Sequence, residues 1–251
     1  MLTGSSLHQL RLFERDLLVW PLLAAFTILM SRYTNLDWQS EQFFYDASRH
    51  LFPARGEWVW AVLGHLGTKY AAIAAGVGLG IWLFRHWQRA DPVLVTALTY
   101  TLATALVAVS VNGQFKSWSG HSCPWDVQGF GGTAHYFRLL ATVPFDAGPG
   151  RCLPSGHAAV GFMWLSAIYA ARRWFPQHAG RTALAVIAFG LLCGIIQIVR
   201  GAHFPSHVLF SAITCGSIAA ASIRLPVWDR LHRYLVNARA VAPVHATTRA
   251  A

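Results

Sequence analysis

Three short polar stretches, far apart in the sequence, carry side chains that could together transfer a phosphoryl group. The clearest is Pro154-Ser155-Gly156-His157. Gly156 lets the backbone approach an anion closely, and a helix beginning here offers free N–H groups and the positive end of its dipole. Ser155 can cap that helix, and His157 in its first turn can protonate a leaving oxygen. Taken alone, these residues are equally well explained as a capped helix start.

The other two stretches supply a nucleophile and positive charge. In the stretch from Arg200 to His207, His203 can present one ring nitrogen to a phosphorus atom while His207 holds the other nitrogen. The alternative is a pair of ordinary interfacial histidines. Lys116 follows an uncharged run, where a lysine is usually an anchor at a membrane helix end. Beside an anion site it would instead bind phosphate oxygens.

The elements that position these residues are expected to be membrane helices. The 251 residues are 55% hydrophobic and 12% charged, and the mean hydropathy is +0.40. A soluble domain carries about 25% charged residues, so the composition indicates an all-α integral membrane protein. We expect one bundle of six transmembrane helices. Its spans are Leu17–Met30, Trp58–Phe84, Pro92–Val111, Ala158–Ala171, Thr182–Val199 and His207–Ile223.

The distribution of arginines predicts the orientation of this bundle. If both termini are cytoplasmic, the inside segments are strongly basic, with residues such as Arg85, Arg172 and Arg173, and contain few acids. The positive-inside rule favours this arrangement. All three chemical stretches then lie at the outer face, which in a bacterial inner membrane is the periplasmic face. The formal net charge is +10 but forms no lysine- or arginine-rich block, so no nucleic-acid partner is expected.

Together the three stretches resemble the type 2 phosphatidic acid phosphatase superfamily, which shares its site with the vanadium haloperoxidases. The family pattern is Lys, six residues, Arg-Pro; then Pro-Ser-Gly-His; then Ser-Arg, five residues, His, three residues, Asp. Here the second element is intact, and the lysine and the first histidine of the third correspond to Lys116 and His203. The resemblance implies that His203 is the nucleophile, forming a phosphohistidine, and that His157 is the acid. Lys116, Ser155 and the Gly156 amide would hold the phosphoryl oxygens, with no metal or cofactor.

The sequence departs from this pattern at three positions. The two family arginines are Cys123 and Gln197, and the orienting aspartate is His207. Phosphoryl transfer depends on positive groups around the equatorial oxygens, so the lost arginines need replacement. Arg200 lies three residues beyond Gln197, on the same side of a helix, and we expect it to replace one of them. The other accessory candidates are Arg151 or Arg138 for charge and Asp126 for orienting His203.

The cysteines divide into two kinds. Cys193 and Cys215 fall within expected spans, where small apolar packing is their ordinary role. Cys123 and Cys152 fall in the outer loop, which is an oxidising place in a bacterial periplasm, and we expect them to form a disulfide. The alternative is two free thiols too far apart to pair.

The function indicated by these observations is that of a membrane phosphatase acting on a lipid phosphate or pyrophosphate, or transferring that phosphate to another acceptor. Its partners would be the lipid substrate and the bilayer. The domain would span residues 1–239, with a phosphatase core at about 92–223 and a disordered tail at 240–251. Two alternatives remain open: a metal-dependent hydrolase with zinc on His157, His203 and His207, and a non-catalytic lipid-binding or transport protein.

Overall fold

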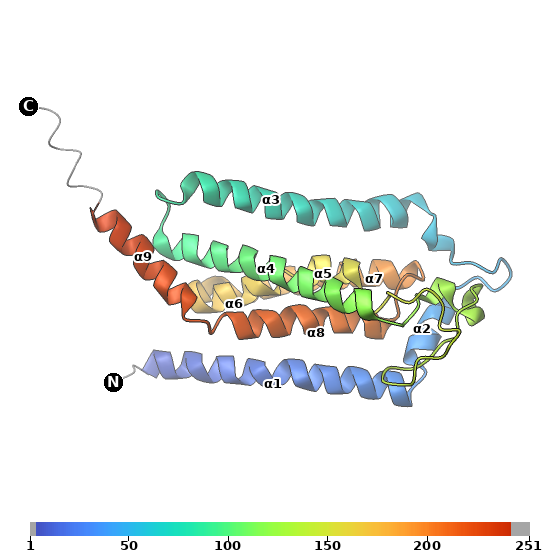
Figure 1. Cartoon of the computed structure of the whole chain (residues 1–251). Helices are drawn as coiled ribbons and strands as arrows, with labels where there is room; N and C mark the ends of the chain where they lie inside the picture. The colour runs from blue at the N-terminus through green and yellow to red at the C-terminus, as the bar shows by residue number, and fades with distance from the viewer. Residues whose placement is uncertain (1–3, 242–251) are drawn as a thin grey trace, which may run out of the picture.

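The computed structural model describes residues 4–241, with side chains described for residues 18–240. Long helices lie side by side in one bundle, and a cap of shorter elements and loops closes the end opposite the two termini (Figure 1). The helices of the bundle are α1 Gly4–Tyr33, α3 Thr68–His86, α4 Pro92–Trp118, α5 Gly156–Phe162, α6 Leu165–Trp174, α7 Ala179–Val199 and α8 Pro205–Ser222. The shorter helices are α2 Leu36–Phe44, the π-helix η2 Val59–Gly67, α9 Val227–Val241 and 3-10 turns at Pro53–Arg55, Pro124–Asp126, Gln128–Phe130 and Pro176–His178.

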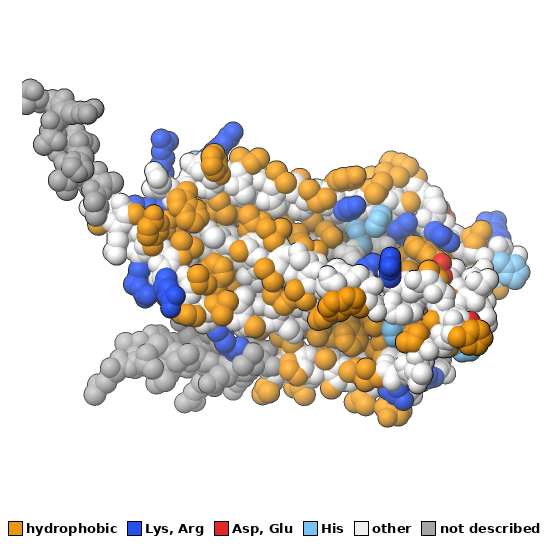
Figure 2. All heavy atoms as spheres, in the orientation of Figure 1, with side chains coloured by type: hydrophobic (Ala, Val, Ile, Leu, Met, Phe, Trp, Pro, Cys, Tyr) orange, Lys and Arg blue, Asp and Glu red, His pale blue; other side chains and the backbone are white. Residues whose placement is uncertain are grey.

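The apolar helices identify a membrane protein, although the expected six spans are shown only in part. Three helical segments of the described chain are long and apolar enough to cross a bilayer: Val59–His86, Pro92–Trp118 and Pro176–Val199. A fourth is possible if Pro205–Ser222 and Val227–Ala240, bent by 55°, count as one span, and Leu18–Tyr33 is a shorter apolar helix. Apolar side chains cover the middle of the face in Figure 2, and charged side chains gather toward its two ends.

Several helix boundaries differ from those expected. The helix α4 begins as predicted at Asp91, whose carboxylate accepts the N–H groups of Val93 and Leu94 at 2.7 and 3.2 Å. It continues past Val111, so Lys116 lies in its last turn. The expected span Ala158–Ala171 is two helices, α5 and α6, and α9 was not predicted at all. Of the expected tail, residues 242–251 lie outside the described residues.

Glycines bring the helices that carry the site into close contact. A side chain at Gly161 of α5 would come within 2.8 Å of the Cα atom of Gly190 in α7. At Gly194 of α7 it would come within 2.4 Å of Val208 in α8. Small residues at helix interfaces permit this close approach in membrane bundles. The starts of α5 and α8 and the end of α7 are thereby held together at the capped end of the bundle.

The cap is held by its own aromatic core. The buried residues Phe52, Val127, Phe130 and Phe204 form this core, and the Trp38 ring of α2 lies 4.5 Å from that of Phe130 between centroids. Since Phe204 belongs to the turn between α7 and α8, the cap packs directly on the turn that carries His203.

Candidate functional site

The three polar stretches singled out in the sequence lie together at the capped end of the bundle. Lys116 is half-buried in the last turn of α4, and its Cδ atom lies 3.6 Å from where a Cβ atom at Gly156 would stand. Its charge acts on His203 in the α7–α8 turn. Figure 2 shows histidine, lysine and arginine side chains gathered near this end. Residues 116, 155–157 and 203 therefore share one site, as their spacing predicted.

Ser155 is fixed in place by hydrogen bonds to three helices. Its N–H donates to the carbonyl oxygen of His207 at 3.0 Å, and its carbonyl oxygen accepts from Ser211 at 2.7 Å and from Asn112 at 3.4 Å. Its side-chain oxygen accepts the N–H of Ala158 at 3.2 Å and caps α5. Because this oxygen is used as an acceptor, the hydroxyl hydrogen is left to donate to an anion.

His157 contacts the segment Val59–His86, which consists of η2 and α3. This segment contributes residues to the site that the sequence did not indicate. Nε2 of His157 lies 2.9 Å from Oγ1 of Thr68. The Thr68 hydroxyl donates to the carbonyl oxygen of Gly64, so Thr68 accepts the Nε2–H of His157. The ring of His65 lies 4.3 Å from the His157 ring between centroids. His157 thus holds a proton on the nitrogen that faces Thr68.

A chain of hydrogen bonds joins His65 to Arg200. The amide nitrogen of Gln197 lies 3.1 Å from Nδ1 of His65, and its oxygen accepts from Arg200 at 3.2 Å. Arg200 also donates to the carbonyl oxygen of Arg55 at 3.3 Å. An amide nitrogen only donates, so Nδ1 of His65 accepts and a neutral His65 carries its hydrogen on Nε2. Gln197, at the place of a family arginine, therefore holds both Arg200 and His65.

His203 is 6% exposed and is oriented by the disulfide. Cys123 and Cys152 are joined in the structure, with their Cα atoms 5.2 Å apart. Sγ of Cys152 lies 3.2 Å from Nδ1 of His203. A disulfide sulfur carries no hydrogen, so Nδ1–H is the donor and Nε2 keeps a free lone pair. Burial lowers the pKa of His203 well below its usual range, and the charge of Lys116 lowers it further. The imidazole is therefore neutral, as a nucleophile must be.

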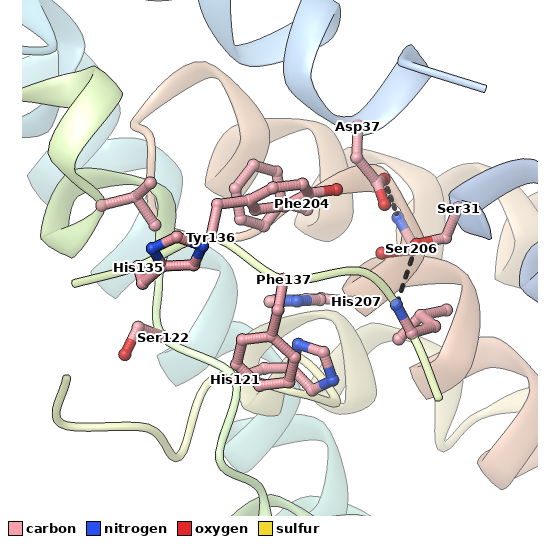
Figure 3. A pocket seen from close by; sticks show the side chains of 12 residues that line it. Ser31, Asp37, His121, Ser122, His135, Tyr136, Phe137, Phe204, Ser206 and His207 are labelled. Carbon is pink, nitrogen blue, oxygen red and sulfur yellow. Dashed lines mark hydrogen bonds between the residues drawn. The ribbon is translucent and has the colours of Figure 1, made fainter. Parts of the chain in front are cut away.

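His207 does not hold Nδ1 of His203 by a direct hydrogen bond. The two rings lie 5.9 Å apart between centroids, and Nδ1 of His207 is buried with no hydrogen-bond partner among the described residues. Figure 3 shows His207 lining a small cavity with Asp37 and His121. Its volume, about 10 Å³, is roughly that needed for one water molecule. Asp37 accepts the N–H of Ser206 at 2.9 Å and so caps the start of α8.

The remaining candidates lie around the site. Asp126 is placed near Arg55, whose guanidinium stacks on Trp125 at 4.3 Å, and burial raises the pKa of this aspartate. Arg151 is exposed next to Cys152. Arg138 turns toward α1 and α2, donating to the carbonyl oxygen of Arg32 and to Asn35. Its guanidinium is thus bound away from His203.

The structure does not gather the three histidines of the zinc hypothesis. Among the described residues, the group with metal-like spacing is Cys123, Cys152 and His203, whose ligand atoms lie within 4.8 Å of one another. Both sulfur atoms are used in the disulfide, and metals bind thiolates. The geometry of this group therefore serves to orient the imidazole of His203.

Comparison with known proteins identifies the family. The chain matches the family model described as the PAP2 superfamily over residues 93–230, which is more than half of its length. No curated protein and no solved structure matches it. The matched region contains Lys116, the Pro154–His157 stretch and His203, while His65 and Thr68 lie outside it. Members of this family are phosphatases, which supports hydrolysis of phosphate esters by this chain. The chain belongs to the PAP2 superfamily.

Proposed function

We propose that this protein is a membrane phosphatase that removes phosphate from a lipid phosphate or diphosphate at the periplasmic face of a bacterial inner membrane, through a phosphohistidine. The observation that carries the proposal is the contact of Nδ1 of His203 with Cys152, because it leaves Nε2 free to attack. Lys116 and His157 both act electrostatically on this imidazole.

Each of these residues has a role that its contacts support. The ammonium group of Lys116, the hydroxyl of Ser155 and the Gly156 amide bind the phosphoryl oxygens, and Arg200 adds positive charge. Nε2 of His203 attacks phosphorus, and the leaving oxygen replaces Thr68 as the acceptor of the Nε2–H of His157 and takes its proton. Water then attacks the phosphohistidine and returns a proton to His157. Transfer replaces hydrolysis if an acceptor hydroxyl takes the place of this water.

A lipid substrate is supported by an apolar groove beside the site. The groove has a volume of about 660 Å³ and reaches Pro154, next to Ser155. It runs between α4 and α8 and is lined by apolar side chains such as Phe115, Trp118, Phe210 and Ile213. A hydrocarbon chain in this groove would keep its phosphate at the headgroup level, where the site lies.

The charge at the other end of the bundle supports the proposed orientation. The basic residues Arg172, Arg173 and Arg224 lie at the ends of α6 and α8 away from the site. The guanidinium of Arg173 binds Asp229 of α9 at 2.6 Å. Segments rich in arginine remain on the cytoplasmic side, which supports a periplasmic position for the site.

Phosphate release by the purified protein in detergent tests this proposal. The substrates are a polyprenyl phosphate, a glycerolipid phosphate and a lipid A phosphate, each with EDTA. We expect release from at least one, complete loss in His203→Ala, and full activity in the control His178→Ala, whose exposed histidine lies at the opposite end. Release abolished by EDTA would favour a metal enzyme, and no release from any lipid would favour a binding or transport protein.

A further inference from the structure

The disulfide and the histidine beside it form a group of three potential metal ligands. The sulfur atoms of Cys123 and Cys152 and a ring nitrogen of His203 lie within 4.8 Å of one another. Sγ of Cys152 is 3.2 Å from Nδ1 of His203, and a sulfur and a nitrogen bound to one tetrahedral zinc are about 3.5 Å apart. Metals bind thiolates, so this group can bind one only when the bridge is reduced or has not yet formed.

Backbone hydrogen bonds hold these ligands near one another independently of the bridge. The N–H of Cys152 donates to the carbonyl oxygen of His121 at 2.9 Å, in the segment that leads to the other cysteine. The turn after that cysteine is bound to the α7–α8 turn, which carries His203, because the N–H of Trp125 donates to the carbonyl oxygen of Gly201 at 3.0 Å. The reduced protein therefore keeps both sulfur atoms on the scaffold that holds the imidazole.

The surroundings of the three ligands suit a soft metal cation. Cys123 is half-buried, so a reductant and a metal can reach it from outside, whereas Cys152 and His203 are buried. Two thiolates cancel the two positive charges of Zn²⁺, so the occupied site adds no net charge to a buried place, where an unpaired charge is costly. Thiolate and imidazole ligands favour zinc and similar soft cations over Mg²⁺ and Ca²⁺.

We propose that Cys123, Cys152 and Nδ1 of His203 form a binding site for Zn²⁺, or a similar soft cation, when the two cysteines are thiols. Three protein ligands leave one position of a tetrahedral zinc for water. Neither His157 nor His207 takes part, so this site differs from the three-histidine site considered above.

The formation of the site balances in two steps. A dithiol reductant gives two electrons and two protons to the S–S bond, which breaks into two thiols, while the dithiol itself becomes a disulfide. Zn²⁺ then forms two bonds to sulfur and one to nitrogen, and the two thiol protons pass to water. The hydrogen on Nδ1 of His203 moves to Nε2 through solvent, so the imidazole stays neutral.

Metal binding removes the nucleophile from the reaction. A neutral imidazole has one nitrogen with a free lone pair, and the metal takes that lone pair at Nδ1. Nε2 of His203 then carries the hydrogen and cannot attack phosphorus. The reduced protein with bound zinc is therefore inactive. This consequence rests on the proposed function, whereas the metal site itself does not.

A cobalt titration tests the site without an activity assay. The full-length protein in detergent is reduced with a phosphine, separated from the reductant without oxygen, and titrated with Co²⁺, whose bonds to thiolates give a charge-transfer absorption in the near ultraviolet. We expect this absorption to saturate at one Co²⁺ per chain in the reduced protein and to be absent in the oxidised protein. Zn²⁺ should displace the cobalt with a Kd of about 1 µM or less.

Single substitutions assign the ligands. Cys123→Ser and Cys152→Ser each leave one thiolate and should lose most of the absorption. His203→Ala keeps both thiolates, so the absorption should remain while the Kd for Zn²⁺ rises by at least about tenfold, since even a residue that supports a metal ligand is worth this much. The control Cys215→Ala removes a free buried cysteine and should change neither the absorption nor the Kd.

Phosphate release by the same samples tests the consequence for activity. One equivalent of Zn²⁺ should lower kcat of the reduced protein by at least about a hundredfold, because loss of a nucleophile costs more than this. EDTA should restore the rate, and the oxidised protein should keep its rate with the same amount of Zn²⁺. Reoxidation that restores the initial rate shows that the reduced protein keeps its fold.

The outcomes separate the metal site from the proposed function. No thiolate absorption in the reduced wild type, or an absorption that persists unchanged in both serine variants, would overturn the site. Zinc bound without loss of activity would overturn the role of Nδ1 of His203 as a ligand. A protein that binds the metal but releases no phosphate from any lipid in its oxidised, metal-free state would overturn the proposed function and leave the metal site in place.

Discussion

Sγ of Cys152 lies 3.2 Å from Nδ1 of His203, so a disulfide occupies the side of this imidazole where the family pattern leads us to expect an orienting aspartate. The backbone carbonyl of Cys152 also lies beside this imidazole and favours its protonated form, opposing part of the effect of burial on its pKa. One residue therefore fixes the tautomer of His203 through two atoms. The bond to Cys123, at the place of a family arginine, fixes Cys152 in turn.

The two cysteines should differ in their effect on the rate. Cys152→Ala removes both the bridge and the sulfur at Nδ1, whereas Cys123→Ala removes the bridge but leaves a thiol beside His203. We expect kcat to fall in both and to fall further in Cys152→Ala, by about tenfold or more, since positioning a catalytic group by a supporting residue is worth this much. Initial rates at saturating substrate measure the difference.

The control is Cys215→Ala, which removes a free buried cysteine of α8 that takes no part in the disulfide. It should retain its rate and its sensitivity to reductant, and alkylation of Cys123 and Cys152 in the wild type should require prior reduction. Equal rates for Cys152→Ala and the wild type would show that the disulfide does not orient the nucleophile.

The pH dependence of kcat/KM should reflect the environment of His203. Burial, assisted by the charge of Lys116, lowers the pKa of this group below the ordinary value of about 6.5. The neutral nucleophile therefore persists as the pH falls, and we expect the acid limb of the profile below pH ~6.5. Lys116→Met removes a positive charge, so it should move this limb to higher pH in addition to lowering the rate. An acid limb at or above pH ~6.5 in the wild type would contradict the assignment.

Glu41 should limit stability at neutral and alkaline pH. Its side chain is fully buried in α2, and neither carboxyl oxygen has a hydrogen-bond partner among the described residues. Burial and the neighbouring Asp37 raise its pKa well above the usual range. The folded protein keeps a proton that the unfolded chain loses above pH ~4.3, so the stability contributed by this group declines as the pH rises.

The variant Glu41→Gln has no such proton to lose. We expect its melting temperature in detergent to exceed that of the wild type by about 2–4 °C at pH ~8, and the difference to shrink at pH ~4.5. Glu57→Gln, which alters an exposed carboxylate near the same end, should show no such trend. A melting temperature of Glu41→Gln below that of the wild type at pH ~8 would mean that Glu41 is ionised in the folded protein.

The sequence revealed the candidate reacting groups because their types and spacing are themselves unusual in a membrane protein. Lys116, Ser155, His157 and His203 were found in this way, and the structure brings them together at one end of the bundle. Expecting Cys123 and Cys152 to pair required only their shared location in the outer loop. The helical class also followed from composition, because long apolar runs with few charges have few other stable forms.

The contribution of η2 and the start of α3 to the site could not be predicted. His65 and Thr68 stand in an apolar run that reads as lipid-facing, and only the packing of η2 on α7 turns them toward His157. A lone histidine between Gly64 and Gly67 was the available signal. The role of Gln197 was missed for the same reason, since its value lies in holding Arg200 and His65, two partners that come from different helices.

The most direct test of the central claim is to trap the phosphorylated enzyme. The protein is mixed with substrate, quenched within milliseconds under alkaline conditions that preserve phosphohistidine, digested and analysed by mass spectrometry. We expect one phosphoryl group on His203, present in His157→Ala when the leaving group needs no proton, and absent in His203→Ala. Phosphate release without any phosphorylated His203 peptide, or with the phosphoryl group on another residue, would contradict the account.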